Sequence, residues 1–163
     1  MVKKSDTEVL LIGGYNSERR VLLFDTQKIR WTVFDNVISG RFSHSCALFE
    51  NKVIIIGGRS ISQDKGNTDL NDVTEIIDLK TMKARIVPNS DLGHDNKLGI
   101  AITDIYGQES LIAFGGHLNS EKRIYIWDSK NEVWHTSNFQ LSERKYGFGY
   151  AVVPRSLVCT NEH

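Results

Sequence analysis

Short apolar segments alternate with polar turns along the chain, and the spacing of the apolar residues is not helical. Apolar residues do not recur three and four positions apart over any long window, as they would on one face of a helix. The segments are rich in Val, Ile, Leu and aromatic residues, and they are bounded by Gly, Asn, Asp and Ser. The pattern therefore predicts an all-β protein.

One combination of segments occurs three times. An apolar strand ends in two glycines, at TEVLLIGG (7–14), NKVIIIGG (51–58) and ESLIAFGG (109–116). A strand that ends in an acid follows each pair, at VLLFD (21–25), VTEIID (73–78) and RIYIWD (123–128). Six residues after the acid stand Trp31, Ala84 and Trp134, and another strand then opens the next unit, at 44–49, 98–105 and 146–153. The chain is therefore predicted to consist of four-stranded units that pack side by side.

The length of the unit is close to that of a propeller blade. The first glycines of the three pairs stand at 13, 57 and 115, so the spacings are 44 and 58 residues. A polar insertion, RSISQDKGNTDLND (59–72), and a lengthened turn at 106–110 explain the longer spacing. Without these additions the unit is about 45 residues long, which is within the range of propeller repeats.

The repeated glycines and tryptophans are interpreted as packing residues. A sheet packed between two others buries both faces, which explains strands that are apolar throughout. Glycine adopts backbone angles closed to other residues and lets a neighbouring backbone approach, and tryptophan fills the wedge between two sheets. The residues with this structural role are Gly13, Gly14, Trp31, Gly57, Gly58, Gly115, Gly116 and Trp134.

The order of these features resembles the kelch-repeat β-propeller family. The family's pattern is an apolar strand, Gly-Gly, a strand ending in aromatic-Asp and, six residues later, a tryptophan. The first and third units match it, whereas the second has Ile77 before its acid and Ala84 in place of the tryptophan. The resemblance covers roughly residues 8–153 and implies a partial propeller of three four-stranded blades. These are 8–34 closed by 146–153, 43–87 and 98–137, with tails at 1–7 and 154–163.

Three blades make only an open arc. Propellers usually close with about four to eight blades, and the end sheets of an arc would expose apolar faces. Two explanations are open. The chain can be part of a longer kelch protein that supplies the missing blades, or two chains can pair as half-rings into a homodimer with two-fold symmetry. We expect the first.

Charge and composition narrow the choice of partner. Lys and Arg together number 20, as do Asp and Glu, so no net charge draws the chain to nucleic acid or to an anionic membrane. The apolar run at 9–12 is too short for a signal peptide, and no run has the roughly 20 apolar residues of a membrane helix. We therefore expect a cytoplasmic protein in which Cys46 and Cys159 are buried thiols, since a disulfide would require an oxidising compartment.

The sequence shows no catalytic or metal-binding arrangement. Phosphate-loop, zinc-protease and nucleophile-elbow motifs are absent. Ser43 adjoins His44, but neighbours on a strand point to opposite faces and cannot form a nucleophile–base pair. His44 opens an inner strand and is interpreted as a structural or pore-lining residue. The histidines do not pair with another His or Cys at metal-ligand spacing, so we expect no metal and no cofactor; they are His44, His94, His117, His135 and His163.

The loops form the remaining candidate site. In a propeller, the loops after the Gly-Gly strands and the loops entering the innermost strands emerge at the same end, and in kelch proteins that end commonly binds peptides. Arginine there suits carboxylates or phosphates on a partner, and tyrosine offers a rigid contact. The candidate partner-binding residues are Tyr15, Asn16, Arg19, Arg41, Arg59, His117, Asn119 and Arg144.

The resemblance thus implies a non-catalytic protein–protein interaction module, part of a larger propeller, with an unidentified protein or peptide as partner. Some kelch-like propellers are copper oxidases or sugar isomerases. A fragment of such an enzyme is therefore the alternative, although the sequence shows no converging set of Tyr, His and Cys that supports it.

Overall fold

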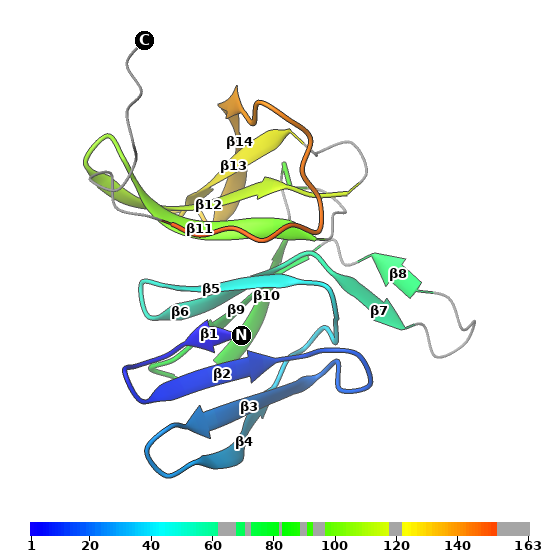
Figure 1. The fold of residues 1–163 in the computed structure, drawn as a ribbon, viewed down its shortest axis with the longest axis vertical. Coiled ribbons are helices and arrows are strands. Elements are labelled where there is room, and N and C mark those ends of the chain that lie inside the picture. Colours follow the sequence, from blue (N-terminus) through cyan, green and yellow to red (C-terminus); the bar gives the residue numbers. More distant parts are fainter. Residues whose placement is uncertain are drawn as a thin grey trace.

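The computed structural model describes residues 1–61, 68–70, 73–81, 83–88, 91–92, 97–117 and 122–152. In these residues there is no helix, and the strands form three four-stranded antiparallel sheets and one two-stranded ribbon. The sheets stack so that the second lies between the first and the third (Figure 1). The prediction of an all-β chain with four strands per unit is confirmed.

The sheets follow one another along the chain. The first has the order β1-β2-β3-β4, from β1 (Val2–Lys3), β2 (Glu8–Ile12), β3 (Arg20–Asp25) and β4 (Arg30–Asn36). The second has the order β10-β9-β6-β5, from β5 (Ser45–Phe49), β6 (Lys52–Ile56), β9 (Val73–Asp78) and β10 (Lys83–Pro88). The third has the order β11-β12-β13-β14, from β11 (Leu98–Ile105), β12 (Gln108–Gly115), β13 (Arg123–Asp128) and β14 (Val133–Gln140). The ribbon of β7 (Arg59–Ile61) and β8 (Thr68–Leu70) lies within the predicted insertion.

The N-terminus, and not the C-terminal segment, completes the first sheet. Val2 pairs with Leu10 in β2, in the place that the sequence analysis gave to 146–153, so residues 1–7 are more than a tail. The described residues 146–152 form no strand and lie along β11 (Figure 1). There the Tyr150 hydroxyl donates to the Ile100 carbonyl (2.6 Å) and accepts from the Ile100 N–H (3.1 Å). The reason is the open stack, in which the second sheet separates the C-terminal segment from β2.

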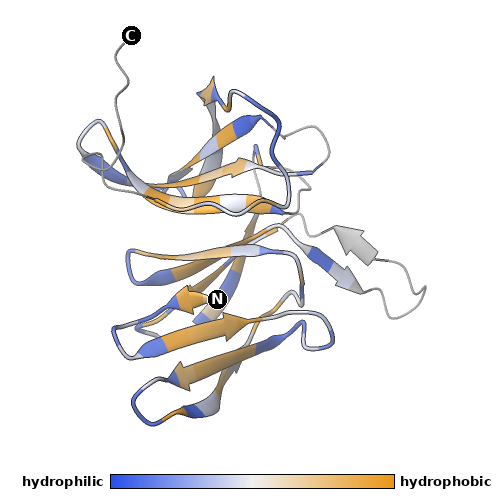
Figure 2. Cartoon of the chain, viewed as in Figure 1, coloured by the Kyte–Doolittle hydropathy of each residue, from blue (hydrophilic) through white to orange (hydrophobic). Residues whose placement is uncertain are grey.

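The second sheet is buried on both faces. In β6, Val53 and Ile55 pack against the first sheet, whereas Ile54 and Ile56 pack against the third. None of these four side chains is more than 1% exposed. A strand between two layers needs apolar residues on both sides, which is why 53–56 is apolar throughout. Figure 2 shows the same concentration of apolar residues along the stacked strands.

An aspartate ends each of β3, β9 and β13, and it stabilises the turn that follows the strand. Asp25, Asp78 and Asp128 accept hydrogen bonds from the backbone N–H groups two and three residues later, at 2.8–3.1 Å. The pKa of each of these carboxyl groups is lowered, and hydrogen bonds from residues of the same turn are the largest cause. The repeated acid is therefore a turn residue, a role that suits the short side chain of Asp.

Candidate partner-binding face

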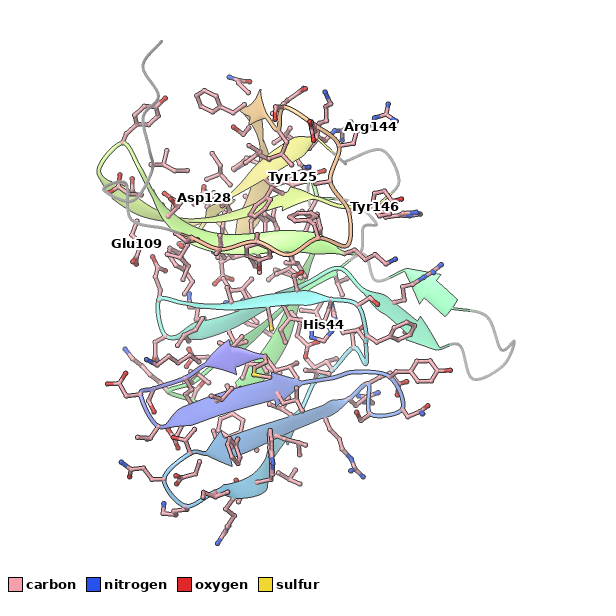
Figure 3. The ribbon with its side chains drawn as sticks, in the orientation of Figure 1. His44, Glu109, Tyr125, Asp128, Arg144 and Tyr146 are labelled. Atoms are coloured by element: carbon pink, nitrogen blue, oxygen red, sulfur yellow. The ribbon has the colours of Figure 1, made fainter. Side chains whose placement is uncertain are left out.

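The loops that follow the glycine pairs and the loops that enter the inner strands lie at one end of the stack. We call this end the loop face; its described residues are 13–20, 37–44, 57–61, 115–117 and 141–149. In Figure 1 it is the side toward which the β7–β8 ribbon projects, opposite the β3–β4, β5–β6 and β11–β12 turns. Arg144 and Tyr146 lie at this end in Figure 3, and Glu109 and Asp128 lie at the other.

The glycine pairs hold the loops that lead to the next unit. The Gly14 N–H donates to the Arg41 carbonyl (3.1 Å), and the Gly116 N–H donates to the Lys145 carbonyl (2.9 Å). The glycine before each has a positive φ, 54° in the first unit and 69° in the third, and a Cβ on it would overlap the same carbonyl oxygen. Only glycine fits such a position. The first and third units therefore build the same loop junction, in which Arg41 and Lys145 are equivalent.

Each junction carries a pair of aromatic rings. Tyr15, directly after the first glycine pair, meets Phe42 edge to face with ring centroids 5.6 Å apart. His117, after the third pair, meets Tyr146 in the same geometry at 5.6 Å. Tyr15 is 68% exposed and Tyr146 is 58% exposed. Sequence reasoning did not select Phe42 or Tyr146. The signal that finds them is their equivalent position: each follows directly after the residue whose carbonyl accepts a hydrogen bond from a glycine pair.

Arg41 does not face a partner, contrary to the expectation from sequence. Its side chain is fully buried and donates to the carbonyls of Ser39, Gly57 and Val73, each at 3.1 Å. It also donates to the Glu75 carboxylate at 3.4 Å. Burial lowers the pKa of the guanidinium, and the charge of Glu75 opposes that shift. The side chain joins loop 37–44 to the second sheet, so its role is structural.

The other selected side chains that the structure describes are exposed on the loop face. They are Asn16, Arg19, Arg59 and Arg144, besides Tyr15 and His117. The backbone of Arg59 exchanges two hydrogen bonds of 2.9 Å with Phe42, which places β7 beside the first junction. Asn119 lies outside the described residues. One end of the stack thus presents the exposed guanidinium groups of Arg19, Arg59 and Arg144 together with the two aromatic pairs.

His44 is partly buried at the base of the loop face, between the first two glycine pairs (Figure 3). A Cβ on Gly13 would lie 3.1 Å from Cε1 of the imidazole, and one on Gly58 would lie 2.9 Å from the His44 Cβ. The pKa of His44 is lowered to about 4, chiefly by burial and then by the positive charges of Arg41 and the N-terminal amino group. A hydrogen bond with the Ile12 backbone opposes this shift. Within the described residues no hydrogen-bond partner reaches Nδ1. The side chain is therefore a neutral packing residue at neutral pH.

The two signature tryptophans differ in burial. Trp134 is fully buried between the second and third sheets, and its indole N–H donates to the Thr74 hydroxyl (3.0 Å). Trp31 lies on the outward face of the first sheet and is 50% exposed. The packing interpretation holds for Trp134. It is not met for Trp31, because none of the described sheets covers that face.

Two cavities open away from the loop face. One, of about 370 Å³, is lined by residues of the second and third sheets that include Glu50, Glu109 and Asp128. Another, of about 250 Å³, lies against the first sheet beside Asp25. Among the described residues no group of three or more His, Cys, Asp or Glu side chains could hold a metal ion. These cavities therefore add no candidate metal centre to the described part of the chain.

Cys46 is a free thiol, and burial raises its pKa. Cys159 lies outside the described residues, so its state stays a prediction. Across the residues that the structure describes, no helix has the length and apolar composition needed to cross a membrane.

Comparisons with known proteins bear on the fold. The sequence matches no protein-family model and no curated protein. A solved structure titled "Structure of YjhT" is similar, with a TM-score of 0.69 and 14% sequence identity. The match covers 88% of this chain and 50% of that chain, so this chain spans half the length of the protein it resembles. At this identity the likeness shows a shared fold and carries no function with it.

Proposed function

We propose that this chain is part of a kelch-type β-propeller and acts as a non-catalytic protein-interaction module that binds its partner with the loop face. The observation that carries the proposal is the repeated junction. Tyr15–Phe42 and His117–Tyr146 form equivalent aromatic pairs at the end of the stack that also presents three exposed arginines. Aromatic and Arg side chains are enriched at protein interfaces and supply much of the binding energy there.

The propeller form is supported by the repetition of local structure. Three consecutive sheets have four strands each, and the third strand of each along the chain (β3, β9 and β13) ends in the same kind of turn aspartate. The first and third units also share the glycine-held junction. A likeness to half of a longer chain fits an open stack that belongs to a larger closed structure.

The chemistry of the loop face favours an acidic peptide. Arg19, Arg59 and Arg144 are exposed, and a guanidinium group binds a carboxylate through two parallel hydrogen bonds. Tyr15 and Tyr146 add apolar ring surface with a polar edge. A tyrosine side chain loses little conformational entropy on binding because it has only two side-chain torsion angles. An extended peptide that alternates acidic and apolar residues would satisfy both kinds of side chain.

Substitutions on the loop face test the proposal. An array of acidic peptides is probed with the chain, and the peptides it retains are titrated by calorimetry. Tyr15→Ala and Arg59→Ala should each weaken binding by about tenfold, which corresponds to about 1.4 kcal/mol for one interface anchor. Tyr106→Ala is the matched control, since Tyr106 is 91% exposed in the turn at the opposite end and should leave binding unchanged.

Two results would count against the proposal. If Tyr106→Ala weakens binding as much as the loop-face variants do, the loop face is not the binding surface. If the purified chain carries stoichiometric copper or zinc, the enzyme-fragment alternative is the better account.

A further inference from the structure

The outward face of the first sheet is apolar across β2, β3 and β4, whereas β1 adds the exposed Lys3 opposite Val9. The register places Val9 opposite Phe24 and Leu11 opposite Leu22, and residues directly opposite each other share a face. Val33, which is 70% exposed, lies opposite Leu22 on the same side. We call this surface the first outer face; it consists of Val9, Leu11, Leu22, Phe24, Trp31 and Val33. A contiguous exposed apolar surface of this kind marks an interaction site.

The third unit shows what covers this surface when a neighbouring sheet is present. Trp134 takes the position of Trp31, six residues after the acid. Trp134 packs on Trp127 with ring centroids 5.1 Å apart, and Trp31 packs on Phe24 at 4.6 Å. The second sheet covers Trp134 completely, whereas Trp31 stays half exposed. The first outer face therefore has the architecture of a sheet-to-sheet interface without its second half.

The third sheet ends in the complementary surface. We call it the third outer face; it consists of Ile112, Phe114, Ile124 and Ile126, which the register places on one side of the sheet. The Phe114 ring also contacts the rings of Phe148 and Tyr150 in the C-terminal segment, so the segment covers part of this face. Counted from the glycine pair, Ile112 takes the position of Ile54 in the second sheet. Counted from the acid, Ile126 takes the position of Ile76. Ile54 and Ile76 belong to the core that buries Trp134. The two ends of the stack thus carry the two halves of one kind of contact.

We propose that two copies of this chain pair so that the first outer face of each packs on the third outer face of the other, which is the alternative to the longer chain expected from the sequence. The proposal rests on the propeller fold proposed above. Two-fold pairing covers all four outer faces at once and closes a ring of six sheets. The likeness to YjhT supports the size of that ring, because this chain spans half of that structure and a second copy supplies as much chain again.

The pairing also gives the C-terminal segment a strand partner. Residues 145–152 correspond to residues 41–48, which lead from a glycine-held junction into β5. β1 pairs with only two residues of β2, whereas β5 pairs with five residues of β6. Tyr150 holds the segment along β11. β5 also lies beside β11, so the segment and β5 have the same kind of neighbour. In the dimer it adds to the inner edge of the partner's β2 in place of β1.

Sedimentation and tryptophan quenching test the pairing. The chain should sediment at micromolar concentration as a compact dimer of twice its 18.5 kDa mass. Two sheet-sized contacts approach the area of obligate interfaces, on the order of 2,000 Å². Trp31 is half exposed in the single chain, while Trp127 and Trp134 are buried. Acrylamide quenching should therefore decrease as the protein concentration rises, and this decrease should be absent in Trp31→Phe.

A charged variant and its control locate the contact. Val33→Asp should convert the dimer into a monomer, because it places a carboxylate within an apolar contact. Val33 is exposed in the single chain, so the sheet tolerates the change, and circular dichroism verifies this. Tyr106→Asp introduces the same charge at an exposed position in the β11–β12 turn, outside both outer faces, and should remain dimeric.

The outcomes are distinct. A chain that stays monomeric with Trp31 quenchable at every concentration would overturn the proposal and indicate that another polypeptide covers the face. Open-ended polymers would overturn it as well, since the ring would then not close. Tyr15→Ala tests peptide binding and should leave sedimentation unchanged, so failure of the dimer and failure of the loop-face function are separable.

Discussion

Replacing Glu75 by glutamine is expected to lower the free energy of unfolding by about 3–5 kcal/mol, the usual cost of removing one partner of a buried ion pair. Glu75 and Arg41 are both fully buried. In Glu75→Gln the guanidinium keeps its charge but loses the carboxylate that offsets its burial. The loss is a large fraction of the roughly 5–15 kcal/mol by which a typical domain is stable. Urea unfolding followed by tryptophan fluorescence measures it.

The hydrogen bonds of Glu75 add to the effect. Its carboxylate accepts the N–H groups of Ile38 (2.5 Å) and Ser39 (3.1 Å), and it thereby fixes loop 37–44 on the second sheet. A glutamine side chain presents one oxygen and one NH2 group in place of the two carboxylate oxygens, so the oxygen that one of these N–H groups meets becomes a donor. The loop is therefore expected to loosen together with the loss of charge pairing.

Two further variants separate the buried charge from general damage. The double variant Arg41→Met with Glu75→Gln should cost less than the sum of the two single variants, because no unpaired charge stays buried. Asp6→Ala removes the exposed ion pair with Lys3 and should leave the urea midpoint unchanged. A Glu75→Gln chain as stable as the unmodified one would contradict the electrostatic argument.

The fold was predictable because its signals are local and repeated. Each signal marks a single strand or turn: the glycine pair, the acid six residues before an aromatic position, and the short apolar strands. Because this set of signals occurs three times, it predicts three sheets. The closing strand was assigned to 146–153 although Val2–Lys3 occupies the place beside β2. Which of the two segments pairs with β2 depends on how far the stacked sheets extend in space. Neither segment carries this information in its own sequence.

The loop face was predictable as a location but not residue by residue. Arg41 was selected because it lies in a loop that enters an inner strand and a guanidinium group suits a carboxylate or phosphate, whereas its partner Glu75 lies in β9, 34 residues away. The equivalent positions of Glu75 hold Leu22 and Tyr125, so the repeat gives no sign of a buried acid. Tyr146 belongs to no motif of the repeat, and only its place directly after the Lys145 carbonyl, which the Gly116 N–H holds, marks it.

The stability of the protein is expected to fall by up to about 3 kcal/mol as the pH is lowered from 6.5 to 4, and His44 is the cause. Its pKa is about 4 in the folded protein, chiefly because of burial, against about 6.5 in an unfolded chain. Between these values the unfolded chain binds a proton at His44 and the folded protein does not. The stabilisation is thus complete above about pH 6.5 and is lost as the pH approaches 4.

His44→Phe isolates this contribution. Phe148 takes the equivalent position in the third unit, where its ring lies against Gly115 (Cε1 2.8 Å from a Cβ built there), so such a junction accommodates a phenyl group. The variant should unfold at nearly the same urea concentration at pH 5 and pH 7, whereas the unmodified chain should be clearly less stable at pH 5. Tyr106→Phe, at an exposed position in the β11–β12 turn, should keep the original pH dependence. The turn aspartates Asp25 and Asp78 have lowered pKa values and contribute only below about pH 4, outside this window. An unchanged slope in His44→Phe would assign the acid sensitivity to another group.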